Sequence, residues 1–168
     1  MPPIGAVFSR EFVLDLCDGD GDDRIAAEIM YFMRIRGWKS WITPTVGHSL
    51  MDMAEEDRHS AAMIALLHLA RGLCDMTVPD LPSVENGFAE LAAEALMTRL
   101  NLPDNKKNVA FIIAEASVMQ AKFLILDDSD LEGLEKGKVN ELLSERGLST
   151  LQIFDRLEFY GLISGERE

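Results

Sequence analysis

A short apolar run followed at once by acidic residues constrains this chain more than any other feature. The run is Lys122–Leu126 (KFLIL), and Asp127, Asp128 and Asp130 come directly after it. Apolar side chains that continue without alternation are typical of a strand in a parallel sheet covered by helices on both faces. In open α/β sheets, ligands bind at the carboxyl ends of such strands. The pattern therefore predicts a buried parallel strand that carries carboxylates to the ligand-binding edge of a sheet.

The rest of the chain alternates between extended and helical patterns. We expect strands at Gly5–Phe8, Trp41–Val46 and Leu148–Ile153, a helix start near Thr45, helices or helical turns at Arg24–Arg36, Leu50–Glu56, Ser60–Gly72, Val84–Leu100, Asn108–Gln120, Asp130–Lys136 and Phe154–Leu162, and a loop or short extended piece at Met76–Ser83. This order predicts an α/β fold, a three-layer α/β/α sandwich with a small parallel sheet.

The length and hydrophobicity of the chain indicate a single domain. A chain of 168 residues with 48% hydrophobic residues can bury one proper core. We expect one domain over residues 1–168, with a core at about 5–131 and a strand and helix extension at 132–168. No apolar stretch approaches the length of a membrane span, and the first residues lack the pattern of a signal peptide. We therefore expect a cytoplasmic protein without a membrane partner.

The net charge argues against a nucleic-acid partner. With 29 acidic and 16 basic residues the chain carries −13 at pH 7, which repels polyanions such as RNA. Nucleic-acid binders usually present a basic face, and the densest basic group here is Arg34, Arg36 and Lys39, with Lys106 and Lys107 as a second. These groups are weak candidates for contacts to a nucleic acid, and solvated helix ends are the alternative reading.

Three segments resemble the PIN-domain superfamily of nucleases. NVAFIIAEASVMQAKFLILDDSDL (Asn108–Leu131) is similar to the C-terminal half of the family, in which a buried helix leads through an Ala-rich face to a strand and an acidic turn. VFSREFVLDLCDGD resembles the first strand and helix of the family, and ITPTVGHSLMDM resembles its second strand and the following helix. The resemblance covers about Ala6 to Leu131 and implies a PIN-like fold.

The resemblance also implies a chemistry, which is metal-dependent phosphodiester hydrolysis. Three or four carboxylates at the strand ends hold one or two Mg²⁺ or Mn²⁺ ions, which activate water and neutralise the phosphate. The first Asp of the family falls on Ser9, its Glu on Ser49, and the Asp of its buried helix on Val109. The acid of its Thr-x-Asp turn is kept as Asp128, although Leu126 replaces the Thr. One family acid of four is therefore retained.

The leading interpretation is a PIN-like protein with a degraded nuclease site. Such a protein needs no metal cofactor and acts by binding a protein partner or by self-association, for instance as a homodimer. The alternative is a divergent, toxin-like ribonuclease that uses Mg²⁺ or Mn²⁺ at a relocated site. The candidate catalytic residues of that site are Asp128, Asp127, Asp130, Glu11 and Asp15, with Asp128 and Asp130 as metal ligands. Whether the protein is an enzyme stays open at this stage.

The acidic segment 18–28 supports a third hypothesis, which is calcium binding. Acids at Asp18, Asp20 and Asp22 and an apolar residue at Ile25 match the first part of an EF-hand loop. Asp23 stands where that loop requires Gly, and Glu28 lies one place before the position of the bidentate ligand. The alternative is a polar loop that leads into a helix N-terminus, where negative charge is favourable.

Overall fold

Five parallel strands form one sheet in a computed structural model that describes residues 2–17, 24–56, 60–72 and 75–165. The strands are β1 (Gly5–Phe8), β2 (Lys39–Trp41), β3 (Met76–Thr77), β4 (Phe123–Ile125) and β5 (Gln152–Phe154). Their order across the sheet is β3-β2-β1-β4-β5, and every pair is parallel. The two central strands, β1 and β4, are buried along their whole length, which agrees with their unbroken apolar sequences.

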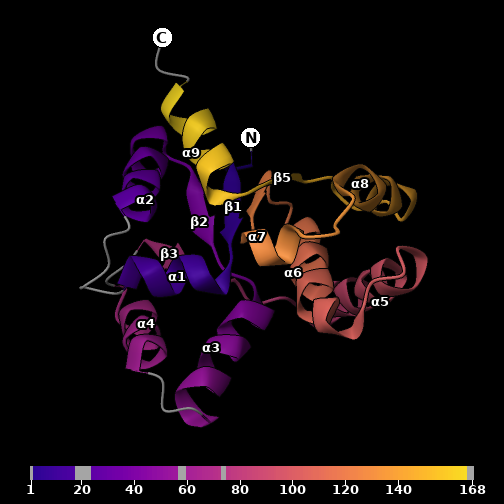
Figure 1. Ribbon diagram of the computed structural model, residues 1–168, viewed down its shortest axis with the longest axis horizontal. Helices are drawn as coiled ribbons and strands as arrows, with labels where there is room; N and C mark the ends of the chain where they lie inside the picture. The colour runs from indigo at the N-terminus through magenta and orange to yellow at the C-terminus, as the bar shows by residue number, and fades with distance from the viewer. Residues whose placement is uncertain (1, 18–23, 57–59, 73–74, 166–168) are drawn as a thin grey trace.

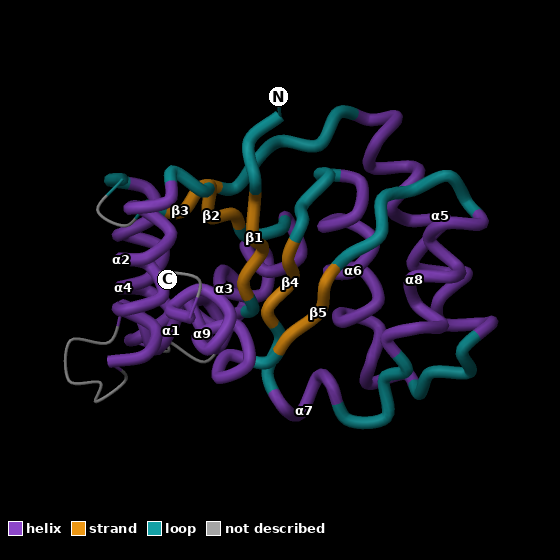
Figure 2. Tube along the Cα trace, turned by 90° about the horizontal axis from the view of Figure 1, so that it is seen from above, coloured by secondary structure: helices purple, strands orange, loops and turns teal. Residues whose placement is uncertain are grey.

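Helices cover both faces of this sheet (Figure 1). They are α1 (Arg10–Cys17), α2 (Arg24–Arg36), α3 (Pro44–Glu56), α4 (Ser60–Ala70), α5 (Ser83–Arg99), α6 (Lys107–Val118), α7 (Asp128–Leu131), α8 (Lys136–Glu145) and α9 (Arg156–Gly165), with a 3₁₀ turn at Asp104–Lys106. Figure 2 shows α1, α2, α4 and α9 on one side of the strands and α5, α6 and α8 on the other. The predicted α/β/α sandwich is confirmed. No helix within the described ranges is long and apolar enough to cross a membrane.

Aromatic rings join the central strands to the helices that flank them. The Phe8 ring stacks on Phe12 of α1 at 4.3 Å between centroids and meets Phe159 of α9 edge-on at 6.1 Å. Phe123 of β4 lies 5.4 Å from the same Phe159 ring. Each of these rings is almost fully buried, and such pairs add to the free energy of burial. The packing holds the carboxyl ends of β1 and β4 in one place, where the candidate site lies.

The expectation of a strand at 41–46 is wrong, because β2 ends at Trp41 and α3 already begins at Pro44. The Thr43 hydroxyl accepts a hydrogen bond from the backbone N–H of Val46 at 3.3 Å, as an N-cap side chain does. Proline is favoured at the first helical position because its fixed φ suits a helix and its missing N–H would have no partner there. The Thr-Pro pair therefore starts a helix where the apolar pattern indicated a strand.

Residues 132–165 contribute to the sheet and to the core. Helix α8 was not expected from the sequence, although its Val139, Leu142 and Leu143 are buried at helical spacing. Its Asn140 side chain donates to the carbonyl of Leu151 and accepts from the N–H of Leu151, both at 2.8 Å, and so holds the chain at the start of β5. Strand β5 begins four residues later than the expected Leu148–Ile153 and pairs with β4. The core thus continues beyond residue 131.

We predict that Gly5→Ala destabilises the protein. A Cβ built on Gly5 would lie 1.9 Å from Cζ3 of the Trp41 ring, so the indole must move. We expect a loss of about 1–3 kcal/mol in the free energy of unfolding, as for other overpacked core positions. Urea unfolding followed by tryptophan fluorescence measures it. Gly137→Ala in α8, where nothing lies within 4 Å of the new Cβ, is the matched control and should be neutral or stabilising. Equal effects of the two substitutions would contradict the prediction.

Candidate functional site

The candidate site lies at the carboxyl ends of β1 and β4. Phe8 and Ile125 are partners in the register of the two strands, so the residues after them, Ser9 and Leu126–Asp127, leave the sheet side by side. The Ser9 N–H donates to the carbonyl of Ile125 at 3.1 Å. The Ser9 hydroxyl donates to Oδ1 of Asp127 at 3.1 Å and accepts from the N–H of Phe12 at 3.3 Å, which caps α1. Parallel pairing therefore brings together two segments that are 118 residues apart in the chain.

The next residue, Arg10, connects α1 to α3. Its Nη1 donates to the hydroxyl of Ser49 at 3.0 Å, and its Nε and Nη2 donate to Oε1 of Glu11 at 3.1 and 2.9 Å. Ser49, one of the positions where the family resemblance implies a carboxylate, thus accepts a hydrogen bond from this guanidinium. The sequence analysis did not single out Arg10, because nothing along the chain relates it to a serine 39 residues away.

The third replaced position, Val109, is buried in α6. Only about 4% of its surface is exposed, and it belongs to the hydrophobic core. A carboxylate at that place would need a partner or a cation, because an unpaired buried charge is costly. The structure therefore has apolar packing at the position where the resemblance implies a metal ligand.

The acids after β4 divide into two environments. Asp127 and Asp130 are half-buried, whereas Asp128, the one retained family acid, is exposed in the first turn of α7. Burial and the nearby charge of Asp130 raise the pKa of Asp127 to about 6, and the Ser9 hydrogen bond and Arg156 act in the opposite direction. Burial also raises the pKa of Asp130, against the lowering effects of an Asp127 backbone hydrogen bond and of the charges of Lys106 and Arg10.

Glu11 pairs with Arg10, whereas Asp15 and Asp127 both lie beside Arg156. The charge of Glu11 raises the pKa of both Asp127 and Asp130, after the larger effect of burial. Asp15 accepts a hydrogen bond from Nη1 of Arg156 at 2.8 Å. Of the five candidate catalytic residues, Asp127 and Asp130 lie together in the turn after β4, where the Asp130 N–H donates to the Asp127 carbonyl at 3.0 Å, and Asp128 is exposed.

Two further basic side chains at this edge were not foreseen as site residues. The Lys106 ammonium donates to the backbone carbonyls of Ser129 and, at 3.3 Å, of Asp130. The Arg156 guanidinium lies over the Phe12 ring, 5.1 Å from its centroid, and its Nη2 is 3.9 Å from Oδ1 of Asp127. Lys106 was noted in the sequence only as part of a weak basic pair, and Arg156 is brought here by the fold of the C-terminal segment.

These residues do not fit a divalent metal ion. Hard cations such as Mg²⁺ and Mn²⁺ require several oxygen ligands, mainly carboxylates, around one point. Among the described residues, no group of three or more His, Cys, Asp and Glu side chains could hold a metal ion. Basic side chains instead stand against the carboxylates. The arrangement can neutralise charge and bind hydrogen-bonding groups, but it lacks the ligand set for metal-activated water.

A buried carboxylate that the sequence analysis overlooked lies behind the site. Glu115 of α6 is about 3% exposed, and its Oε1 accepts a hydrogen bond from the N–H of Thr45 at 3.1 Å, at the start of α3. Burial raises its pKa, while hydrogen bonds with Thr45 and Thr43 and the charge of His48 lower it. The one detectable signal was a lone acid in the otherwise apolar run of α6. Its place at a helix N-terminus indicates a structural role.

The other sequence candidates lie away from this edge. Arg34 forms an ion pair with Asp75, and Nη2 of Arg36 donates to the carbonyl of Ile163 at 2.7 Å. Lys39 is exposed at the first residue of β2, the end of that strand opposite to the site edge. Residues 18–23 of the candidate calcium loop lie outside the described residues. Glu28, the candidate bidentate ligand, accepts a hydrogen bond from the Tyr160 hydroxyl.

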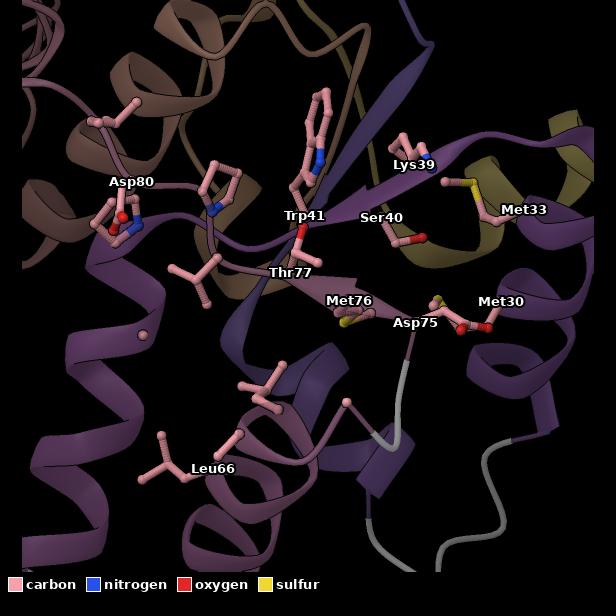
Figure 3. A pocket seen from close by; sticks show the side chains of 18 of the residues that line it. Met30, Met33, Lys39, Ser40, Trp41, Leu66, Asp75, Met76, Thr77 and Asp80 are labelled. Carbon is pink, nitrogen blue, oxygen red and sulfur yellow. The ribbon is translucent and has the colours of Figure 1, made fainter.

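A wide groove lies beside β2 and β3. It has a volume of about 1270 Å³, and Figure 3 shows its lining. Methionines from α2 and β3 and leucines from α4 make much of the wall, together with Trp41 and Pro79. Arg34 and Asp75 bring charge to the same groove. The groove is mainly apolar and has polar groups at a few points, as binding sites for partner side chains or small ligands have.

Comparisons with known proteins support the fold of this chain but assign it to no family. No family model matches the chain, and no curated protein matches it. Among solved structures, the chain is similar to one in the crystal structure of VapBC2 from Rickettsia felis bound to a DNA fragment from their promoter. The TM-score is 0.55 at 8% sequence identity, and the match covers 89% of this chain and 98% of the other. This likeness and the five-stranded parallel sheet show a PIN-like α/β/α sandwich.

We predict that Asp127 makes the protein less stable as the pH rises through about 6. The folded state binds the proton of Asp127 more tightly than the unfolded state does, because the pKa of Asp127 is raised on folding. This tighter binding adds to the free energy of unfolding below pH 3.8, the ordinary pKa of the side chain, and the contribution is lost as the pH rises past about 6. The loss amounts to at most about 3 kcal/mol. Urea unfolding of Asp127→Asn between pH 4 and 8 should show a weaker pH dependence than the wild type. Asp128→Asn, the exposed neighbour, serves as control and should keep the wild-type slope.

Proposed function

We propose that this protein is a PIN-like domain with a degraded metal-nuclease site, and that it acts by binding a protein partner or a second copy of itself. The observation that carries the proposal is the replacement of the acids at the sheet edge. Ser9 and Ser49 stand where two carboxylates are implied, and Arg10 is hydrogen-bonded to Ser49. Val109 is packed in the core at the third position. Because the fold is present while the carboxylates that would hold a metal ion are replaced, a binding function is better supported than hydrolysis.

An exposed apolar stripe on α5 supports a binding role. Val84, Phe88 and Leu91 follow one another at helical spacing, and they are 70%, 54% and 57% exposed. Aligned apolar side chains of this kind mark helix surfaces that pack against other proteins. The similar chain from Rickettsia felis was crystallised as VapBC2 with a promoter DNA fragment, which supports a protein partner for this fold.

The alternative is a divergent Mg²⁺- or Mn²⁺-dependent ribonuclease. It needs at least three carboxylates around one cation. Glu11 and Asp130 are among the candidate ligands, but no group of three or more His, Cys, Asp and Glu side chains in the described part of the chain could hold a metal ion. Arg10 and Lys106 already lie against them, and the net charge of −13 disfavours RNA. We therefore place this alternative second.

We predict that the wild-type protein binds no Mn²⁺ in isothermal titration and leaves single-stranded RNA intact in the presence of Mg²⁺ or Mn²⁺. The physical reason is the missing ligand set at Ser9, Ser49 and Val109. Asp128→Asn, measured in parallel, should behave like the wild type. Cleavage of RNA that depends on the metal and disappears in Asp128→Asn would establish the nuclease instead.

We also predict that Phe88→Asp weakens association through α5. If the α5 stripe binds a second copy, the wild type should elute as a dimer in size-exclusion chromatography with light scattering. Phe88→Asp should raise the dissociation constant of this dimer at least about tenfold, as a change at a central interface residue does, and so increase the fraction of monomer. Leu157→Asp, an equally exposed apolar position on α9, controls for a general effect of surface charge. A monomeric wild type would direct the search to a different protein as the partner of this stripe.

A further inference from the structure

Acidic residues border the apolar stripe of α5 on both sides. Glu85 lies three positions before Phe88, and residues three or four apart are neighbours on the surface of a helix. Glu94 lies three positions after Leu91, on the opposite side of the stripe, and Glu90 is its neighbour one turn earlier. The stripe is therefore an apolar row with carboxylates along both of its borders.

The described residues supply no cation to these three carboxylates. Arg99 is the single basic residue of α5, and it pairs with Glu145 at 2.7 Å. Glu90 accepts a hydrogen bond from the Asn86 amide at 3.3 Å, which leaves its charge in place. Glu90 and Glu94 are both exposed and four positions apart, a spacing at which like charges destabilise a helix. A cation from outside the chain would relieve this repulsion.

A small pocket opens at the N-terminal end of the same stripe. It has a volume of about 410 Å³, and its apolar walls include Trp41, Leu81, Val118 and Met119. Asp80 and Glu85 belong to the same lining, and no basic residue is found among the described residues that form it. Because Glu85 also borders the stripe, the pocket and the stripe form one continuous surface. An apolar cavity with carboxylates fits a Lys or Arg side chain, which has an apolar stem and a cationic head.

Charge selects the kind of molecule that this surface fits. A second copy of the chain would bring another net charge of −13 and the same acidic borders to the interface. Nucleic acids and anionic membrane surfaces are repelled for the same reason. A protein segment that combines apolar side chains with Lys or Arg complements both the stripe and its acids. Val84, Phe88 and Leu91 also stand at i, i+4 and i+7, which is the spacing through which one helix packs against another.

We propose that α5 and the pocket at its N-terminal end bind a basic amphipathic helix of another protein. The apolar side chains of that helix pack on the stripe, and its Lys and Arg side chains lie against Glu85, Glu90 and Glu94. One of these cationic side chains enters the pocket beside Trp41. The proposal rests on the proposed function, because it names the class of partner for a domain that acts by binding.

Two synthetic helical peptides of about 18 residues, which differ only in charge, test the class of partner. Both carry the same leucine face, and the positions beside that face are Lys in one peptide and Glu in the other. Fluorescence anisotropy with the full chain measures both dissociation constants. We expect the basic peptide to bind at least about tenfold more tightly than the acidic one, and added NaCl to weaken its binding. Equal affinities for the two peptides would overturn the proposal.

A matched pair of double variants tests the place of binding. Glu90→Lys with Glu94→Lys reverses the acids of the stripe, whereas Glu55→Lys with Glu56→Lys makes the same change in net charge at the exposed end of α3. We expect the first pair to weaken binding of the basic peptide at least about tenfold and the second pair less than about twofold. Equal losses would show that net charge alone attracts the peptide and would overturn the proposal. Glu90→Gln with Glu94→Gln repeats the test if the Lys variant does not fold.

The fluorescence of Trp41 tests the pocket directly. Trp38 is the other of the two tryptophans, so Trp41 is alone in a Trp38→Phe background. Saturation with the basic peptide should shift or quench the emission of Trp41, because a cation then lies beside its ring. Asp80→Asn with Glu85→Gln should remove most of this change. Unchanged emission at saturation would overturn the role of the pocket.

The outcome of these tests is separate from that of the proposed function. Metal-dependent RNA cleavage by the wild type would refute the proposed function. An inert wild type that dimerises through α5, or that binds the two peptides equally well, would keep the proposed function and overturn only the class of partner.

Discussion

The pairing of β1 with β4 is the constraint on which the rest of the structure depends. It places Phe8 opposite Ile125, so that Ser9 and Asp127 emerge together and form a hydrogen bond at 3.1 Å. Both strands are fully buried, and the Phe8, Phe12 and Phe159 rings lock them to the helices above. A shift of one residue in this register would turn each side chain to the opposite face, against helices that it is not shaped to fit, and would separate the two strand ends. The geometry of the candidate site thus follows from the packing of the core.

Basic side chains lie beside the acidic residues at the carboxyl edge of the sheet. In a parallel sheet the carboxyl ends of all strands lie at the same edge. In this chain acidic residues follow those ends, and partial burial makes their negative charges energetically costly. Arg10 donates to Glu11, Lys106 donates to the backbone carbonyl of Asp130, and Arg156 donates to Asp15 and lies 3.9 Å from Asp127. Arginine suits this task because its planar fork donates to several acceptors at once and keeps its charge when partly buried. The edge is therefore balanced by side chains of the protein itself.

The acidic surface and the apolar stripe of α5 favour the same kind of function. The net charge of −13 makes a polyanion an unfavourable partner, whereas Val84, Phe88 and Leu91 offer an apolar helix face to a protein. The core includes residues of β5 and α9 from the C-terminal segment. A domain of this kind retains the architecture of its structural neighbour and can serve as a binding scaffold.

The sequence by itself determined the elements whose signals are local. The unbroken apolar run predicted β4, the bounds of β1 and α2 agree with those expected, and Gly37 with φ of 68° ends α2 as a glycine C-cap does. The helix start expected near Thr45 is confirmed, but the local pattern extended the strand before it too far, because β2 ends at Trp41. The local pattern also missed α8, whose buried residues pack against α5. The resemblance to PIN domains placed Ser9, Ser49 and Val109 at positions where that family carries acids, and this placement stays a prediction. Tertiary structure alone decided that Arg10 reaches Ser49 and that Arg156 reaches Asp15, because these contacts join residues 39 and 141 positions apart, and no periodicity along a chain encodes such distances.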